Sequence, residues 1–209
     1  MNPDPAKSEH FAGASRRRRR VGVLALQGDF REHIAALAAC EVEALPVRLA
    51  VDLVDVDALV IPGGESTTMS RLMQPDLRRG LQARVAEGMP LLGTCAGMIL
   101  MAREVSDGRP DQEPLGLMDI TVRRNAYGRQ IDSFEAEVES PAIGGSGPAV
   151  FIRAPQLLSK GGDVQDLAEH DGHPVALKQG ARLALAFHPE LTPDRRWHQY
   201  FLSLLEQSE

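Results

Sequence analysis

Residues 89–102 read MPLLGTCAGMILMA, a short apolar run, a group of small residues around one cysteine, and a second apolar run. The first run is typical of a buried parallel strand, and the second has the composition of a helix packed against a sheet. Small residues on both sides of Cys95 allow a sharp turn between the two elements. A nucleophile on such a turn projects from the backbone beside the unpaired N–H groups that begin the helix. The segment predicts an α/β fold with Cys95 as a nucleophile; the alternative is a small cysteine buried between strand and helix.

Strand-like apolar runs alternate with segments of helical spacing throughout the first half of the chain. The expected strands of this half are residues 21–26, 44–49, 58–61 and 89–93, and the expected helices are 30–40, 66–73 and 77–86. From residue 119 onward, strand-like segments are separated by turn residues, GGSGP (144–148) is expected to be a loop, and a helix is expected over 193–205. This alternation of strands and helices predicts a parallel sheet with helices on both faces, and we expect the sheet to continue in mixed or antiparallel strands.

Charge is unevenly distributed along the 209 residues. The chain contains 23 Lys+Arg and 29 Asp+Glu, a net charge of −6, but residues 1–20 alone carry +4, so residues 21–209 carry −10. We expect residues 1–20, which include Arg16–Arg20, to be a disordered basic extension and residues 21–209 to form a single domain. The acidic body lacks basic stripes and is poor in aromatic residues, which argues against nucleic-acid binding.

Hydropathy and cysteine content argue against a membrane-spanning protein and against a disulfide-stabilised one. No run approaches the roughly 18 apolar residues of a membrane span. With only Cys40 and Cys95, the chain has no disulfide framework, and a reducing cytoplasm is the expected location.

A thiol nucleophile needs a general base, and the base needs an acceptor that orients it. Of the six histidines, only His188 follows a buried strand-like run, residues 183–187, and strand ends are where the sites of parallel sheets form. Glu190 comes two residues later, and in an extended chain both side chains would face the same way. Either residue alone is an ordinary loop residue; together with Cys95 they form a candidate triad. The other histidines are His10, His33, His170, His173 and His198.

The glycine-rich segment PGGESTT (62–68) follows the third expected strand. Paired glycines let backbone N–H groups approach a ligand or an oxyanion, and Ser66 is expected to cap the next helix. No Gly-Lys-Ser/Thr follows, so the segment is not a Walker loop, and the absence of Gly-x-Ser-x-Gly argues against a serine hydrolase. A zinc site built from Cys95, His170 and His173 lacks further ligands, so no metal is expected.

With PGGES, GTCAG (93–97) and FHPE in place, the chain resembles the class I (triad-type) glutamine amidotransferases. Within this class it is most similar to the glutaminase subunits of pyridoxal 5′-phosphate synthase. The resemblance extends from about residue 21 to residue 205. It includes GVLALQG (22–28), REH (31–33), PGGESTTM (62–69), RNAYGRQ (124–130), DSFE (132–135), FIRAP (151–155) and FHPELT (187–192).

The resemblance implies a three-layer α/β/α sandwich with a mixed, mostly parallel, flavodoxin-like central sheet. It also implies that Cys95 attacks the substrate, that His188 transfers protons and that Glu190 orients His188. Backbone N–H groups of Gly64 and Ala96 are the candidates for an oxyanion hole. The residues expected to bind L-glutamine are Gly64, Glu65, Ser66, Arg124, Ile152 and Arg153. The two arginines suit an amino-acid ligand because a guanidinium can bind a carboxylate through two hydrogen bonds.

The implied activity is hydrolysis of L-glutamine to L-glutamate and ammonia, without a cofactor. Ammonia would pass within a hetero-oligomeric complex to a synthase subunit that makes pyridoxal 5′-phosphate. One alternative is an amidotransferase subunit of another pathway, such as histidine biosynthesis, and the PGGESTT, GRQIDSFE and FIRAP segments argue against it. A second alternative is a catalytically idle regulatory subunit, and the complete set of Cys95, His188 and Glu190 argues against that. A thiol-redox protein is disfavoured because Cys95 has no resolving cysteine near it in sequence.

Overall fold

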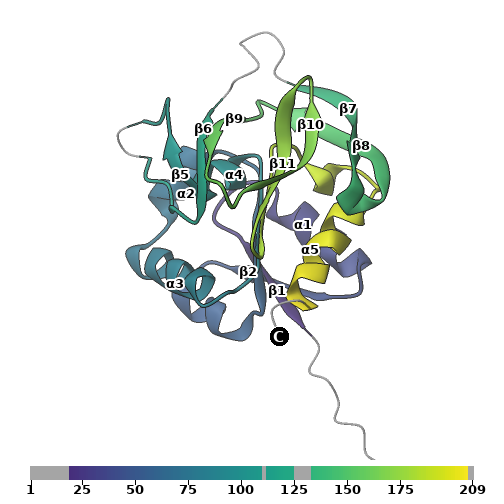
Figure 1. Ribbon diagram of the computed structural model, residues 1–209. Helices are drawn as coiled ribbons and strands as arrows, with labels where there is room; N and C mark the ends of the chain where they lie inside the picture. The colour runs from purple at the N-terminus through teal and green to yellow at the C-terminus, as the bar shows by residue number, and fades with distance from the viewer. Residues whose placement is uncertain (1–18, 110–111, 125–132, 207–209) are drawn as a thin grey trace, which may run out of the picture.

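The computed structural model describes residues 19–109, 112–124 and 133–206, and a central sheet runs through this part of the chain (Figure 1). Its seven strands are β1 Arg20–Leu24, β2 Glu43–Val47, β3 Ala58–Ile61, β4 Leu91–Thr94, β10 Gln165–His170, β11 His173–Gln179 and β12 Arg182–Leu185. They lie in the order β10-β11-β12-β4-β3-β1-β2. Strands β3 and β4 are buried along their whole length, because helices cover both faces of the sheet.

Five strands of this sheet are parallel, and their order fixes the location of the functional site. The parallel order β2-β1-β3-β4-β12 is the 2-1-3-4-5 order of flavodoxin-like folds. Strands β10 and β11 extend the β12 edge as antiparallel neighbours, which makes the sheet mixed. In such sheets, ligands bind at the carboxyl ends of the parallel strands. The segments after β1, β3, β4 and β12 are therefore brought to one edge.

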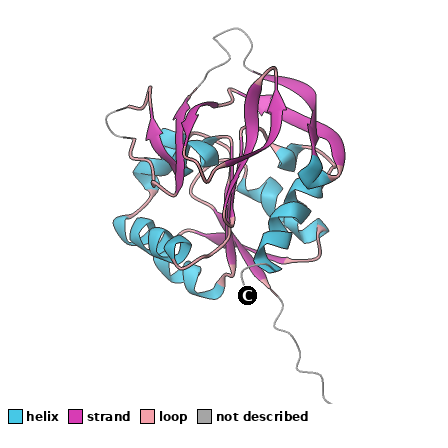
Figure 2. Cartoon of the chain, in the orientation of Figure 1, coloured by secondary structure: helices cyan, strands magenta, loops and turns pink. Residues whose placement is uncertain are grey.

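Helices cover the two faces of the sheet, as the ribbon views show (Figures 1 and 2). The helices are α1 Phe30–Ala39, α2 Ser66–Leu72, α3 Pro75–Ala86, α4 Ala96–Met101 and α5 Arg196–Glu206, with short 3-10 helices η1 Ala50–Asp55, η2 Pro141–Ile143 and η3 Pro189–Leu191. Helices α1 and α5 lie on one face and α2, α3 and α4 on the other. Helix α5 buries Trp197, Phe201 and Leu204 at helical spacing, which gives it one apolar face against the core. The predicted α/β/α sandwich with a mixed, mostly parallel sheet is confirmed.

Two smaller sheets flank the central one. Strands β5 Ala102–Val105, β6 Met118–Arg123 and β9 Gln156–Lys160 form a three-stranded sheet. Strands β7 Ser133–Ser140 and β8 Gly145–Ile152 form an antiparallel hairpin. The prediction of a loop over 144–148 was wrong, because Gly145 pairs with Ser140 and continues the ladder. Gly144, at φ 71°, makes the left-handed turn that precedes β8, and cross-strand pairing outweighs the low strand propensity of glycine and proline there.

The N-terminal boundary can be followed only in part. Arg20 is the first residue of β1, and the rest of the expected extension up to residue 18 lies outside the described residues. Most of RNAYGRQ and the Asp132 position also lie outside them. Within the described residues, no helix is long and apolar enough to cross a bilayer.

Candidate active site

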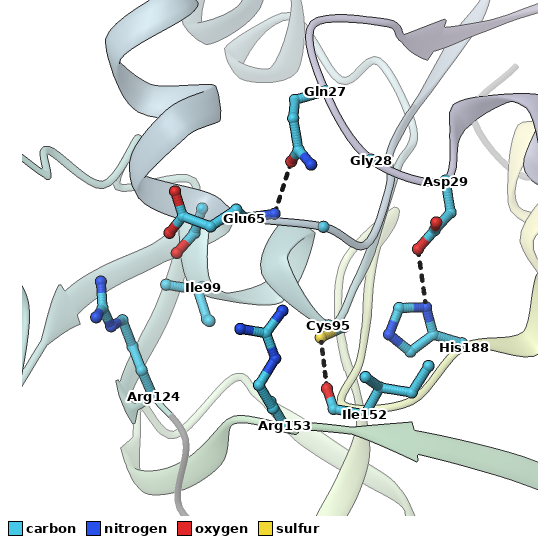
Figure 3. A pocket seen from close by; sticks show the side chains of 12 residues that line it. Gln27, Gly28, Asp29, Glu65, Cys95, Ile99, Arg124, Ile152, Arg153 and His188 are labelled. Atoms are coloured by element: carbon cyan, nitrogen blue, oxygen red, sulfur yellow. Dashed lines mark hydrogen bonds and ion pairs between the residues drawn. The ribbon is translucent and has the colours of Figure 1, made fainter. Parts of the chain in front are cut away.

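A pocket of about 440 Å³ opens at the carboxyl edge of the parallel strands (Figure 3). Its lining consists of Gln27, Gly28, Asp29, Gly64, Glu65, Ser66, Cys95, Ile99, Arg124, Ile152, Arg153 and His188. Eight residues proposed from sequence are among them, and a ninth, Glu190, lies behind His188. Ala96 is buried and is not among the lining residues. The sheet order thus brings the predicted site residues to one place.

Cys95 occupies a strained turn between β4 and α4. Its backbone has φ 48° and ψ −102°, a conformation that residues other than glycine rarely adopt. Its N–H donates to the carbonyl of Leu185 at 2.8 Å, which continues the β4–β12 ladder and holds the strained residue. Glycine is required on both sides: a Cβ at Gly97 would lie 2.0 Å from the carbonyl oxygen of Ile61, and a Cβ at Gly93 2.3 Å from the sulfur of Met101. The sharp turn predicted around Cys95 is therefore present, and the Cys95 thiol donates to the Ile152 carbonyl at 3.5 Å.

His188 and Glu190 form a buried pair next to Cys95. Nδ1 of His188 lies 2.8 Å from Oε1 of Glu190 and 3.5 Å from Oδ2 of Asp29. The pairing was predicted, but its geometry was not, because Glu190 lies in the 3-10 helix η3 rather than in extended chain. The backbone N–H of His188 donates to the carbonyl of Val150 at 2.8 Å, so β8 holds the backbone from which the imidazole projects.

The charges around His188 favour its protonated form. Burial alone lowers the pKa of His188, but interactions with Cys95 and Glu190 outweigh burial and raise it to about 10. Burial also raises the pKa of Asp29, partly offset by the positive charge of His188. Nε2 of His188 is buried without a hydrogen-bond partner among the described residues, which leaves this nitrogen free for proton transfer.

The glycine-rich turn after β3 packs directly against His188. A Cβ at Gly63 would lie 2.2 Å from Cε1 of the imidazole, so only glycine fits beside the ring. Gly64 has φ 143°, and the N–H of the next residue, Glu65, donates to Oε1 of Gln27 at 2.6 Å. The prediction that Ser66 caps α2 was wrong: Glu65 is the N-cap, and its carboxylate accepts from the N–H groups of the second and third helical residues. Ser66 is instead the first residue of the helix.

The far end of the pocket is basic. Figure 3 shows Arg124 and Arg153 on one side of Cys95 and His188 on the other. Nη1 of Arg124 donates to Oγ1 of Thr67 at 3.0 Å and to Oε1 of Gln112. A ligand with a carboxylate at one end could therefore place its other end against the thiol.

Some residues of the site were missed in the sequence analysis. Gln27 and Asp29 follow β1, so the rule that sites form at strand ends could have found them. Gln112 belongs to a stretch without sequence signal, yet its side chain is 6% exposed and donates through Nε2 to Oγ of Ser66 at 2.9 Å. Nothing in a single sequence indicates that contact.

The same residues include a group of possible metal ligands. Among the described residues, Asp29, His188 and Glu190 bring one ligand atom each to within 4.8 Å of one another, and neither His170 nor His173 takes part in such a group. The hydrogen bond between His188 and Glu190 occupies the nitrogen that an ion would need, so the arrangement suits proton transfer.

The chain matches the family described as SNO glutamine amidotransferase over residues 23–207. It belongs to this family. The match covers nearly all of the described chain, and it confirms both the amidotransferase family and the enzyme class predicted from the motifs.

Two proteins of known name and one solved structure resemble this chain over most of its length. "Pyridoxal 5'-phosphate synthase subunit PdxT" of Mycobacteroides abscessus is 56% identical over 186 residues, which cover 88% of this chain and 96% of that protein. The protein of the same name from Acidothermus cellulolyticus is 57% identical over 196 residues, 90% of this chain and 94% of the relative. A crystal structure described as a glutamine amidotransferase superposes with a TM-score of 0.85 at 48% identity, covering 89% of this chain and 98% of that one.

Proposed function

We propose that this chain is the glutaminase subunit of a pyridoxal 5′-phosphate synthase. It hydrolyses L-glutamine to L-glutamate and ammonia and delivers the ammonia to a synthase subunit. The observation that carries the proposal is one pocket lined by Cys95 on a strained turn, by two arginines and by His188, whose imidazole is hydrogen-bonded to Glu190 behind it. Relatives that are 56% and 57% identical over most of the chain carry the name of a pyridoxal 5′-phosphate synthase subunit, which supports this pathway. The free cysteines support a reducing, cytoplasmic location.

In the proposed mechanism, Cys95 is the nucleophile. His188 holds the proton that the Cys95 thiol releases, and the sulfur attacks the carboxamide carbon of glutamine. Collapse of the tetrahedral intermediate breaks the C–N bond, and His188 donates its proton to the leaving ammonia. Water, deprotonated by His188, then attacks the thioester, and L-glutamate and the free thiol are regenerated. Glu190 holds the imidazole in one orientation and stabilises its positive charge.

Backbone and side-chain groups around the thiol would bind the rest of the substrate. We assign the developing oxyanion to the N–H groups of Gly64 and Ala96. The glutamine itself is assigned to Gly64, Glu65, Ser66, Arg124, Ile152 and Arg153, of which Arg124 and Arg153 supply the positive charge for the α-carboxylate. Glu65 is kept ionised by hydrogen bonds from α2: burial raises the pKa of this carboxyl, but those bonds outweigh burial and lower it.

The test is glutamate release from L-glutamine, measured for the purified chain with and without the synthase subunit. We expect low activity alone, a large rise with the partner, and none for Cys95→Ala in either case. Full activity of Cys95→Ala would refute the mechanism. Activation by a histidine-pathway partner, but not by a pyridoxal 5′-phosphate synthase subunit, would refute the pathway.

A further inference from the structure

Behind Glu190, two further histidines are completely buried. His33 of α1 and His198 of α5 are both 0% exposed, and neither lines the pocket. Nδ1 of His33 lies 3.2 Å from Nε2 of His198. Nε2 of His33 lies 3.0 Å from Oγ1 of Thr94 and 3.3 Å from Oε2 of Glu190. The cluster connects both helices of one face to the carboxylate that holds His188.

Both of these imidazoles are neutral near pH 7. Burial, assisted by the neighbouring imidazoles of His198 and His188, lowers the pKa of His33 well below 6.5. Burial, followed by the charge of Arg195, lowers the pKa of His198 to about 4. Each ring therefore carries a single proton, on one of its two nitrogens.

The contacts of the cluster decide which nitrogen carries that proton. Nδ1 of His198 is buried and has no hydrogen-bond partner among the described residues. Because buried N–H groups are rarely left without an acceptor, this nitrogen holds the lone pair and Nε2 of His198 holds the proton. That proton is donated to Nδ1 of His33. The remaining nitrogen of His33, Nε2, is therefore an N–H that faces Thr94 and Glu190.

Glu190 needs a donor at this position. Its Oε1 bonds to Nδ1 of His188, whereas its Oε2 is buried and makes no hydrogen bond of regular geometry among the described residues. Burial raises the pKa of Glu190, and the positive charge of His188 opposes that rise only in part. An N–H dipole beside the second oxygen stabilises the carboxylate and restricts its rotation.

We propose that His33 is a positioning residue for the catalytic carboxylate. Its Nε2–H, shared between Thr94 and Glu190, keeps Oε2 in place and thereby keeps Oε1 on His188. His198 supports this role by fixing the tautomer of His33. The inference rests on the proposed Cys–His–Glu mechanism and assigns that mechanism a further residue.

The tautomer can be measured in the wild-type protein, before any substitution. Long-range ¹⁵N–¹H correlation spectra of the histidine rings distinguish N–H from lone-pair nitrogens. We expect His33 and His198 to be neutral between pH 6 and pH 8, with the proton on Nε2 in both. A proton on Nδ1 of His33 would overturn the inference, whether or not the enzyme is active.

The kinetic test compares two substitutions in the complex with the synthase subunit. His33→Leu removes the N–H and should lower kcat for glutamine hydrolysis about tenfold, the scale of one hydrogen bond to a charged group, with KM unchanged. His33→Gln keeps an amide N–H at the end of its side chain and should restore most of kcat. His173→Gln is the matched control, because His173 is exposed and hydrogen-bonded to Gln156 at the surface.

The outcomes separate this inference from the proposed function. A folded His33→Leu enzyme with wild-type kcat, or with a change in KM alone, would overturn the positioning role. If His33→Leu does not fold, a kcat of His33→Gln no higher than that of an inactive Glu190→Ala enzyme would overturn it. If the wild-type complex releases no glutamate, the proposed function fails, and the ring spectra still decide the arrangement of the cluster.

Discussion

A methyl group at Gly63 should disable the imidazole of His188 without removing any catalytic atom. An ideal Cβ at this position lies 2.2 Å from Cε1 and 2.7 Å from Nδ1 of His188, whereas ordinary contacts begin at 3.4 Å. Gly63 is not in the left-handed backbone region, so alanine brings a steric clash but no backbone strain. The ring must retreat by about 1 Å, a misplacement that costs about 100-fold in rate.

The stability of Gly63→Ala should change much less than its activity. Overpacking costs about 1–3 kcal/mol, and the smaller entropy of the unfolded alanine chain offsets about 0.4–1 kcal/mol of it. We therefore expect a folded protein with a slightly lower Tm and a kcat/KM for glutamine about 100-fold below wild type.

Two other glycines serve as controls for this experiment. A Cβ at Gly162 meets no heavy atom within 4 Å, so Gly162→Ala should behave as wild type in both assays. A Cβ at Gly97 meets the Ile61 carbonyl at 2.0 Å, so Gly97→Ala should lose stability as well as activity. Full kcat/KM in the Gly63→Ala complex would refute the argument that the His188 ring must occupy its observed position.

Three other substitutions test separate parts of the site. Cys95→Ala should abolish glutamate release and retain glutamine binding in calorimetry, because in the proposed mechanism the thiol is the nucleophile and does not bind the substrate. Loss of the heat of binding would contradict this. Gln112→Leu removes an acceptor of Arg124 and should raise KM for glutamine about tenfold with little effect on kcat; an unchanged KM would show that Arg124 is held without it. Pairing raises the pKa of His188 from 6.5 to about 10, so the folded state binds this proton more tightly than the unfolded state. The stability of wild type relative to His188→Asn should be greatest below pH 6.5 and fall as the pH rises toward 10. Denaturant unfolding at several pH values measures this difference, and a pH-independent difference would contradict the interactions of His188 with Cys95 and Glu190.

The placement of the candidate triad could be predicted from sequence because local signals marked the strand ends. Cys95 lies between a buried strand and an apolar helix, and His188 follows another buried strand, so the parallel sheet had to bring them to one edge. Glu190 was paired correctly for a wrong reason: a 3-10 turn, not extended chain, directs it to His188.

The supporting contacts were not predictable, because they join residues far apart in the chain. His33 and His198 are 165 positions apart, and neither has a local pattern that distinguishes it from an ordinary helical histidine. Gln112 lies in a loop, where no periodicity constrains the side chain. Only the packed structure shows that His33 lies beside Glu190 and that Gln112 bonds to Arg124.

Different kinds of structure hold the Cys95 end and the arginine end of the pocket, so substitutions at the two ends should affect catalysis and substrate binding separately. Thr94 pairs with Leu185 in the β4–β12 ladder, and the N–H of Cys95 donates to the carbonyl of that same Leu185. The register of β4 and β12 therefore positions Cys95, and the β8 carbonyl of Val150 holds the backbone of His188. A one-residue slip would destroy that register along the whole buried sheet. At the arginine end, Arg124 depends on side-chain contacts to Gln112 and Thr67, from a loop and a helix. Sheet register is much harder to change than such side-chain contacts. Substitutions at the arginine end should therefore alter KM first, whereas substitutions in the β4–β12 ladder should alter kcat and folding together.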